Sequence, residues 1–112
     1  MNYQVSFTEE FANDLKKLVR KYPSLKSELD TLMNELSLNP TLGQSLGNNT
    51  YKIRLAVKSK GRGKSGGLRV ISYIITFKEL VFLIAIYDKS DMGNISDNII
   101  KAKTIRIDKF LI

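Results

Sequence analysis

Residues 52–77, KIRLAVKSKGRGKSGGLRVISYIITF, decide how the rest of the chain is arranged. They predict a strand, a basic glycine-rich loop and a second strand, because apolar residues alternate with cations before the glycines and form a nearly continuous run after them. Eight of the eighteen Lys and Arg residues, and none of the eleven acids, lie between Tyr51 and Lys78. The net charge of +7 is therefore concentrated in one hairpin, which favours a phosphate backbone as partner.

The N-terminal part of the chain predicts a strand followed by a helical hairpin. Apolar and polar residues alternate over residues 3–7, which is typical of a half-buried strand. An apolar stripe then runs from the expected N-cap Thr8 to Tyr22, where the following proline ends the helix. A second stripe, with Ser24 as the expected cap, closes near Asn39. Such a short joint between two helices indicates that they lie antiparallel.

The remainder predicts a small sheet and a last helix. Residues 41–50 form a turn-rich linker, and strands are expected over 51–57, 68–77 and 80–87. A short helix with a frayed tail is expected after Ile95. The order β-α-α-β-β-β-α predicts an α+β fold, in which the helical hairpin packs on a small antiparallel sheet and a C-terminal helix follows.

The composition narrows the chemistry. A length of 112 residues fits one domain covering residues 1–112. The absence of cysteine and histidine excludes disulfides and thiolate chemistry, and removes the commonest metal ligand and general base. We therefore expect no metal and no small-molecule cofactor. The N-terminus lacks a signal-peptide pattern and the longest apolar run, residues 80–87, is too short to span a bilayer, so a cytoplasmic protein without a membrane partner is expected.

Two nucleotide-binding patterns in the loop are accidental. G-x-G-x-x-G is satisfied at positions 61–66, but that fingerprint requires a helix after its last glycine, and a strand is expected from Leu68. Gly-Lys-Ser at 63–65 imitates the end of a P-loop, yet the earlier glycine that a P-loop requires is replaced by Lys58.

The loop cations are better explained by contact with phosphates. They occupy every second position with no acid among them: Lys58, Lys60, Arg62 and Lys64. A soluble hairpin tip is the alternative, but it does not require this pattern. We therefore predict that these four residues contact phosphates.

Two strands carry further candidates. Arg69 enters an apolar strand, where a guanidinium must be paired or must face a cleft, and it shares its side of the strand with Tyr73. We count Tyr73 among the candidate RNA contacts, although a place in the core is favoured. Tyr87, Asp88 and Lys89 close the last strand beside a loop, a usual place for functional side chains, with a solvated turn as the alternative.

With these residues in view, the chain resembles the RelE/ParE superfamily of toxins from bacterial type II toxin–antitoxin modules. The resemblance covers almost the whole chain, and KGRGKSGGLRVI (60–71) followed by LIAIYDKSD (83–91) is most similar to the HigB branch. It implies a RelE-like fold and a ribosome-dependent endoribonuclease (mRNA interferase). Such a toxin cuts messenger RNA in the ribosomal A site, inhibits translation, and is neutralised by an acidic antitoxin protein.

The resemblance also implies site residues. Cations of the family that line the site correspond here to Lys52, Arg54, Arg69 and Lys89. Some members use a tyrosine or histidine near the C-terminus as general base. This chain departs from that pattern, because it has no histidine and no tyrosine beyond Tyr87.

The chemistry can be argued without the family. Cleavage of RNA through its own 2′-hydroxyl requires a base, cations around the phosphate and an acid for the leaving oxygen, and it requires no metal. We expect Arg69 and Lys89 at the scissile phosphate, with Lys52 and Arg54 supporting the site and the loop cations holding RNA. Either Tyr87 or Asp88 is the candidate proton carrier. The alternatives are a ParE-like toxin that poisons gyrase and a non-catalytic RNA-binding domain.

Overall fold

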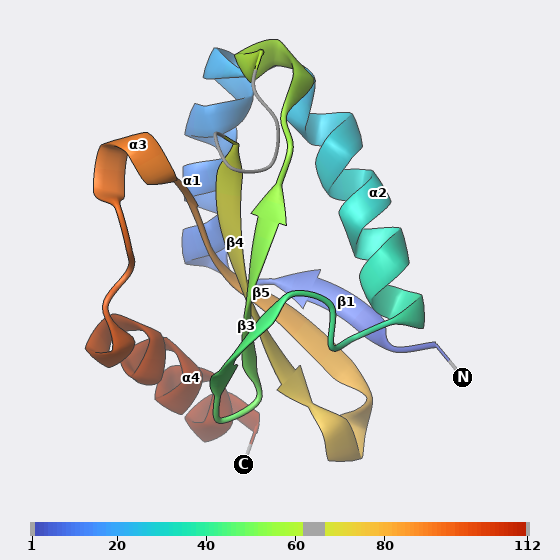
Figure 1. Cartoon of the computed structure of the whole chain (residues 1–112). Helices are drawn as coiled ribbons and strands as arrows, with labels where there is room; N and C mark the ends of the chain where they lie inside the picture. Colours follow the sequence, from blue (N-terminus) through green and yellow to red (C-terminus); the bar gives the residue numbers. More distant parts are fainter. Residues whose placement is uncertain (1, 62–66, 112) are drawn as a thin grey trace.

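The protein forms a five-stranded sheet between helices, as described by a computed structural model of residues 2–61 and 67–111 (Figure 1). The strands are β1 (Gln4–Phe7), β2 (Gln44–Gly47), β3 (Thr50–Leu55), β4 (Leu68–Ile75) and β5 (Leu80–Asp88). The helices are α1 (Glu9–Lys21), α2 (Leu25–Leu38), α3 (Lys89–Met92) and α4 (Asp97–Leu111), and the short 3-10 helices are η1 (Lys58–Lys60) and η3 (Thr76–Lys78). The predicted α+β class is confirmed.

The sheet has the strand order β1-β5-β4-β3-β2. All neighbouring strands are antiparallel except β1, which lies parallel to β5. The two long apolar strands, β4 and β5, occupy central positions, as their continuous hydrophobic runs predict. The β4–β5 pairing shifts by one residue between Ile71 and Ser72, where a β-bulge lies.

Both faces of the sheet are covered (Figure 1). Helices α1 and α2 pack on one face, and that core contains Phe11, Leu25, Leu36, Val70 and Leu83. Helix α4 packs on the other face, where the core contains Ile71, Ile84, Ala85, Ile100 and Ile107. The second face also carries the candidate site, so the docking of α4 determines what surrounds that site.

The starts of the first two helices differ in their capping. Thr8 caps α1 as predicted, since its Oγ1 accepts the backbone N–H of Phe11 at 3.2 Å. The predicted side-chain cap of α2 is wrong. The hydroxyl of Ser24 donates instead to Glu28 at 3.0 Å and accepts the backbone N–H of Ser59 at 3.0 Å. The N-terminus of α2 is thereby tied to η1, at the base of the basic loop.

The expected linker over residues 41–50 contains an additional strand. Strand β2 pairs with β3 through a tight turn in which Asn48 and Asn49 have φ of 52° and 63°. Asparagine tolerates this left-handed conformation, so these two residues can form the turn of a β-hairpin. Four strand residues at a sheet edge give too weak a period to be recognised in the sequence.

The prediction that the C-terminal helix is short is also wrong, because α4 has fifteen residues. Contacts with a distant part of the chain hold it: Arg106 Nη1 lies 2.7 Å and Lys103 Nζ 3.3 Å from the carboxylate of Glu10. In the part of the chain that the structure describes, no helix is long and apolar enough to cross a membrane.

Candidate functional site

Three strands bring the predicted site residues together on the α4 face of the sheet. In the register of β3, β4 and β5, Arg54 lies opposite Arg69, and Arg69 lies opposite Tyr87. Lys52 lies two residues from Arg54, opposite Ile71, and side-chain alternation places it on the same face. Residues far apart in the sequence thus form one cationic row, which we define as Lys52, Arg54 and Arg69 with Tyr87 at its end.

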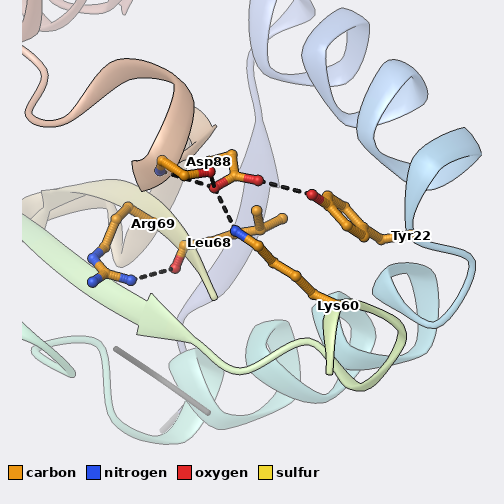
Figure 2. A network of polar contacts seen from close by, with 6 residues as sticks. Tyr22, Lys60, Leu68, Arg69 and Asp88 are labelled. Carbon is orange, nitrogen blue, oxygen red and sulfur yellow. Dashed lines mark hydrogen bonds and ion pairs between the residues drawn. The ribbon is translucent and has the colours of Figure 1, made fainter. Parts of the chain in front are cut away.

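The cations of the site differ in their access to solvent. Arg54 and Lys89, the first residue of α3, are exposed, and Lys52 is half-buried. Arg69 is only 2% exposed, and its guanidinium donates to the carbonyl oxygen of Leu68 at 3.3 Å (Figure 2). A guanidinium this deeply buried acts on a phosphate through its electric field, or by contact after neighbouring segments move. Arg54 and Lys89 are therefore the site cations that an external anion can reach directly.

A small hollow of about 190 Å³ adjoins this row, between the sheet and the start of α4. Its lining consists of Leu46, Lys52, Tyr87, Asn94, Ile95, Asp97 and Ile100. Tyr87 is 6% exposed, and its buried hydroxyl has no hydrogen-bond partner among the described residues. Sequence reasoning missed Asn94 and Asp97, because only the docking of α4 brings them beside Lys52 and Tyr87. The single signal in the sequence was their place next to the predicted helix start at Ile95.

Asp88 lies on the opposite side of β5 and accepts hydrogen bonds from three residues (Figure 2). Its Oδ1 accepts Lys60 Nζ at 2.5 Å, the Ser90 hydroxyl at 2.7 Å and the Ser90 backbone N–H at 3.0 Å. Its Oδ2 accepts the Tyr22 hydroxyl at 2.9 Å. Burial alone would raise the pKa of this carboxyl, but the hydrogen bonds from Lys60, Ser90 and Tyr22 outweigh it and hold the pKa well below its usual range. Such a carboxylate stays ionised near neutrality, which argues against Asp88 as the proton carrier.

The same network changes the expected role of Lys60. Its side chain is 12% exposed, its ammonium pairs with Asp88, and it lies 5.8 Å from the centre of the Tyr22 ring. Lys60 is therefore engaged inside the protein instead of being open to phosphate. Lys58, on the same turn, is exposed and anchored by its backbone N–H, which donates to Glu28 at 2.8 Å. The other two predicted loop contacts, at positions 62 and 64, lie outside the described residues.

Tyr73 holds α4 against the sheet. It is half-buried, and its hydroxyl donates to Asp108 of α4 at 2.7 Å. Burial and the neighbouring carboxylate raise the pKa of Tyr73 to about 12. This arrangement favours the structural alternative for Tyr73 over the predicted RNA contact.

Two further features of the described residues bear on what the site could bind. Among residues 2–61 and 67–111 no group of three acidic, histidine or cysteine side chains could hold a metal ion. Another hollow, of about 690 Å³, lies between α2 and β3, and its lining includes Glu28 and Glu35 as well as Lys52 and Arg54. The two carboxylates would repel a phosphate, so an anion is better placed on the α4 face, beside the cationic row.

The comparisons with solved structures show the fold. The isolated E. coli RelE toxin is 23% identical, with a TM-score of 0.60 over 94% of this chain and 98% of that one. A double arginine-to-alanine mutant of E. coli RelE in the free state is 23% identical, with a TM-score of 0.63 over 83% of this chain and 90% of the other. The E. coli RelBE toxin–antitoxin complex contains a chain that is 24% identical, with a TM-score of 0.60 over 77% of this chain and 95% of that chain.

The sequence itself shows the family. The profile described as "RelE toxin of RelE / RelB toxin-antitoxin system" matches residues 9–108, which is most of the chain. The described elements from α1 through most of α4 lie within this match, and β1 precedes it. The chain therefore belongs to the RelE toxin family of toxin–antitoxin systems.

Proposed function

We propose that this RelE-family toxin is a ribosome-dependent endonuclease of messenger RNA that works without a metal and inhibits translation. The proposal is carried by the cationic row of Lys52, Arg54 and Arg69 with Tyr87 at its end. Lys89 follows directly after β5. Cations fixed on neighbouring strands suit a reaction whose main demand is the stabilisation of a doubly charged phosphate in the transition state. The likeness to the HigB branch stays a prediction.

The cations divide into two groups by access. Arg54 and Lys89 are exposed and would contact the scissile phosphate, and Lys52 would approach from the rim of the hollow. Arg69 would act beneath them as a fixed positive charge, because it is buried and its position is set by β4. Removing one such group from a preorganised site typically costs about 10²- to 10³-fold in rate.

Tyr87 is the better of the two candidate proton carriers. Tyr87 lines the hollow, and its buried hydroxyl has no hydrogen-bond partner within the described part of the chain. It is therefore available to exchange a proton with a substrate oxygen, whereas the carboxylate of Asp88 already accepts four hydrogen bonds from Lys60, Ser90 and Tyr22. An inactive Asp88→Asn variant that keeps wild-type stability would reverse this assignment.

An antitoxin is the expected protein partner. The family match and the likeness to the E. coli RelBE complex support a neutralising protein, and the net charge of +7 favours an acidic one that covers the basic surface. Association between such surfaces should weaken as salt rises, so an affinity independent of ionic strength would contradict this part of the proposal.

The test maps new RNA 5′ ends after purified protein is added to a translation reaction, with naked messenger as control. We expect cuts within the reading frame only when ribosomes are present. Arg54→Ala should reduce cutting about 10²-fold or more, while Lys26→Ala, which removes an exposed cation from α2, should leave it unchanged. Cuts on naked messenger would indicate a free ribonuclease. Absence of cuts from a protein that still kills cells would favour a gyrase-directed toxin.

A further inference from the structure

The hollow beside the cationic row has polar groups that the protein itself leaves without partners. Its polar lining consists of Lys52, Tyr87, Asn94 and Asp97, and none of these side chains has a hydrogen-bond or ion-pair partner in the described ranges 2–61 and 67–111. Tyr87 stands out among them, because a buried hydroxyl normally has a partner, whereas the hydroxyl of this lining residue has none among the described residues. A ligand bound in the hollow would supply the partners that these groups lack.

The size and walls of the hollow fit one nucleobase. Its volume of about 190 Å³ is below the range of ≈ 300–1,000 Å³ that is usual for larger small-molecule ligands. Leu46, Ile95 and Ile100 supply apolar surface against which the flat faces of a base can pack. Single-stranded RNA is commonly recognised in this way, with an unstacked base held by its faces and read along its Watson–Crick edge.

We propose that this hollow binds a guanine base, that of the nucleotide directly 5′ of the cut, and that Asp97 reads it. The placement relative to the cut rests on the proposed nuclease function. A carboxylate only accepts hydrogen bonds, and it has two oxygens with which to accept them. Guanine alone among the four bases presents two adjacent donors, N1–H and the N2 amino group, on its Watson–Crick edge. Adenine and cytosine present a ring acceptor there, which a carboxylate repels, and uracil presents one donor between two acceptors.

The local structure leaves Asp97 available for this contact. It is the first residue of α4, where the positive end of the helix dipole favours an ionised carboxylate. The capping of the helix start is performed by Ser96, whose Oγ accepts the backbone N–H of Ile99 at 3.2 Å. Asn94 lies on the same wall, and its amide can donate to the O6 acceptor of guanine.

The location of Tyr87 and Lys52 assigns the bound nucleotide its place relative to the cut. The nucleotide 5′ of the cut carries the 2′-hydroxyl that attacks the phosphate. Because the candidate proton carrier Tyr87 and the cation Lys52 line the same hollow as Asp97, one nucleoside can present its base to Asp97 and its ribose to Tyr87. Recognition of the base and activation of its own ribose would then occur in one site.

The experiment titrates guanosine 3′-monophosphate and adenosine 3′-monophosphate into the free full-length protein and follows the methyl NMR signals of Ile95 and Ile100. We expect both methyl signals to shift, with the guanosine nucleotide binding about tenfold more tightly or better, since a good bidentate base contact discriminates at that level. Asp97→Asn should abolish the difference. Asp30→Asn, which neutralises an exposed acid on α2, should preserve it.

The same variants in the translation reaction test the placement. Wild-type protein should cut with guanine enriched directly 5′ of the new end, and Asp97→Asn should cut without that enrichment. Equal affinity for the two nucleotides, or shifts that spare Ile95 and Ile100, would overturn the guanine-binding hollow. Guanosine preference together with no RNA cuts would support the hollow and contradict the nuclease proposal. Cuts that continue without any guanosine preference would do the reverse.

Discussion

Replacement of Lys60 by methionine should lower the free energy of unfolding by about 3 kcal/mol at pH 7, because it leaves the buried carboxylate of Asp88 without its counter-charge. Methionine keeps an unbranched apolar stem of similar length, so the packing against Tyr22 is largely retained. The hydrogen bonds from Tyr22 and Ser90 remain, but neither donor carries a charge. Removal of one partner from a buried ion pair typically costs about 3–5 kcal/mol, and the 12% exposure of Lys60 places the expected value at the lower end.

The pH dependence gives this prediction a second, independent magnitude. The folded-state pKa of Asp88 is lowered, so the pair stabilises the protein above the unfolded pKa of about 3.9, and that stabilisation is lost as the pH falls. Between pH 7 and pH 3 the wild-type protein should lose about 1.3 kcal/mol through this group. Without Lys60, fewer hydrogen-bond donors oppose the effect of burial, which raises the pKa of Asp88. The variant should therefore lose less stability than the wild-type protein between pH 7 and pH 3. The difference between the two proteins should narrow to about 2 kcal/mol at pH 3.

Urea unfolding followed by far-ultraviolet circular dichroism at both pH values measures these quantities. Lys58→Met is the matched control, because it removes an exposed cation from the same turn and should change stability by no more than about 0.5 kcal/mol. Lys58→Met should instead weaken RNA binding. A Lys60→Met protein as stable as the control, or an equal loss at pH 7 and pH 3, would refute the assignment of Lys60 to a buried ion pair.

Three further predictions concern hydroxyl groups. Tyr87→Phe removes a buried hydroxyl without a partner among the described residues. The free energy of unfolding should therefore stay the same or rise by about 1 kcal/mol, while RNA cleavage falls. Reduced stability together with full cleavage would contradict both roles. Ser72→Ala should be neutral or stabilising by up to about 1 kcal/mol in urea unfolding, because the Ser72 hydroxyl is buried at the bulge without a partner there, and a clear loss would reveal a missed hydrogen bond. In an ultraviolet absorbance titration Tyr73 should ionise with a pKa of about 12, above its ordinary value, and Asp108→Asn should lower that pKa; an unchanged titration would mean that α4 is not held by this contact.

The elements that could be predicted from the sequence are those whose side chains repeat with a clear period. The apolar stripe and Thr8 predicted α1, and the continuous β-branched run predicted β4 as a central strand. Strand β2 could not be predicted in this way, since four edge residues acquire their conformation from pairing with β3. The length of α4 depends in part on the contact between Glu10 and Arg106, which are separated by 96 positions in the chain.

The candidate site likewise has a part that the sequence pattern predicts and a part that only the fold determines. Alternation on β3 predicted that Lys52 and Arg54 share a face, and the strand register then added Arg69 and Tyr87 to them. In the loop, by contrast, cations at every second position are equivalent in the sequence but not in the fold. Lys58 and Lys60 are two residues apart on a 3-10 turn, which does not follow the alternation of a strand, and Lys60 lies where Tyr22 ends α1 and Asp88 ends β5. A uniform basic pattern thus contains one cation that pairs with a buried carboxylate and another that stays exposed, because the burial of a charge is decided by segments that meet only in three dimensions.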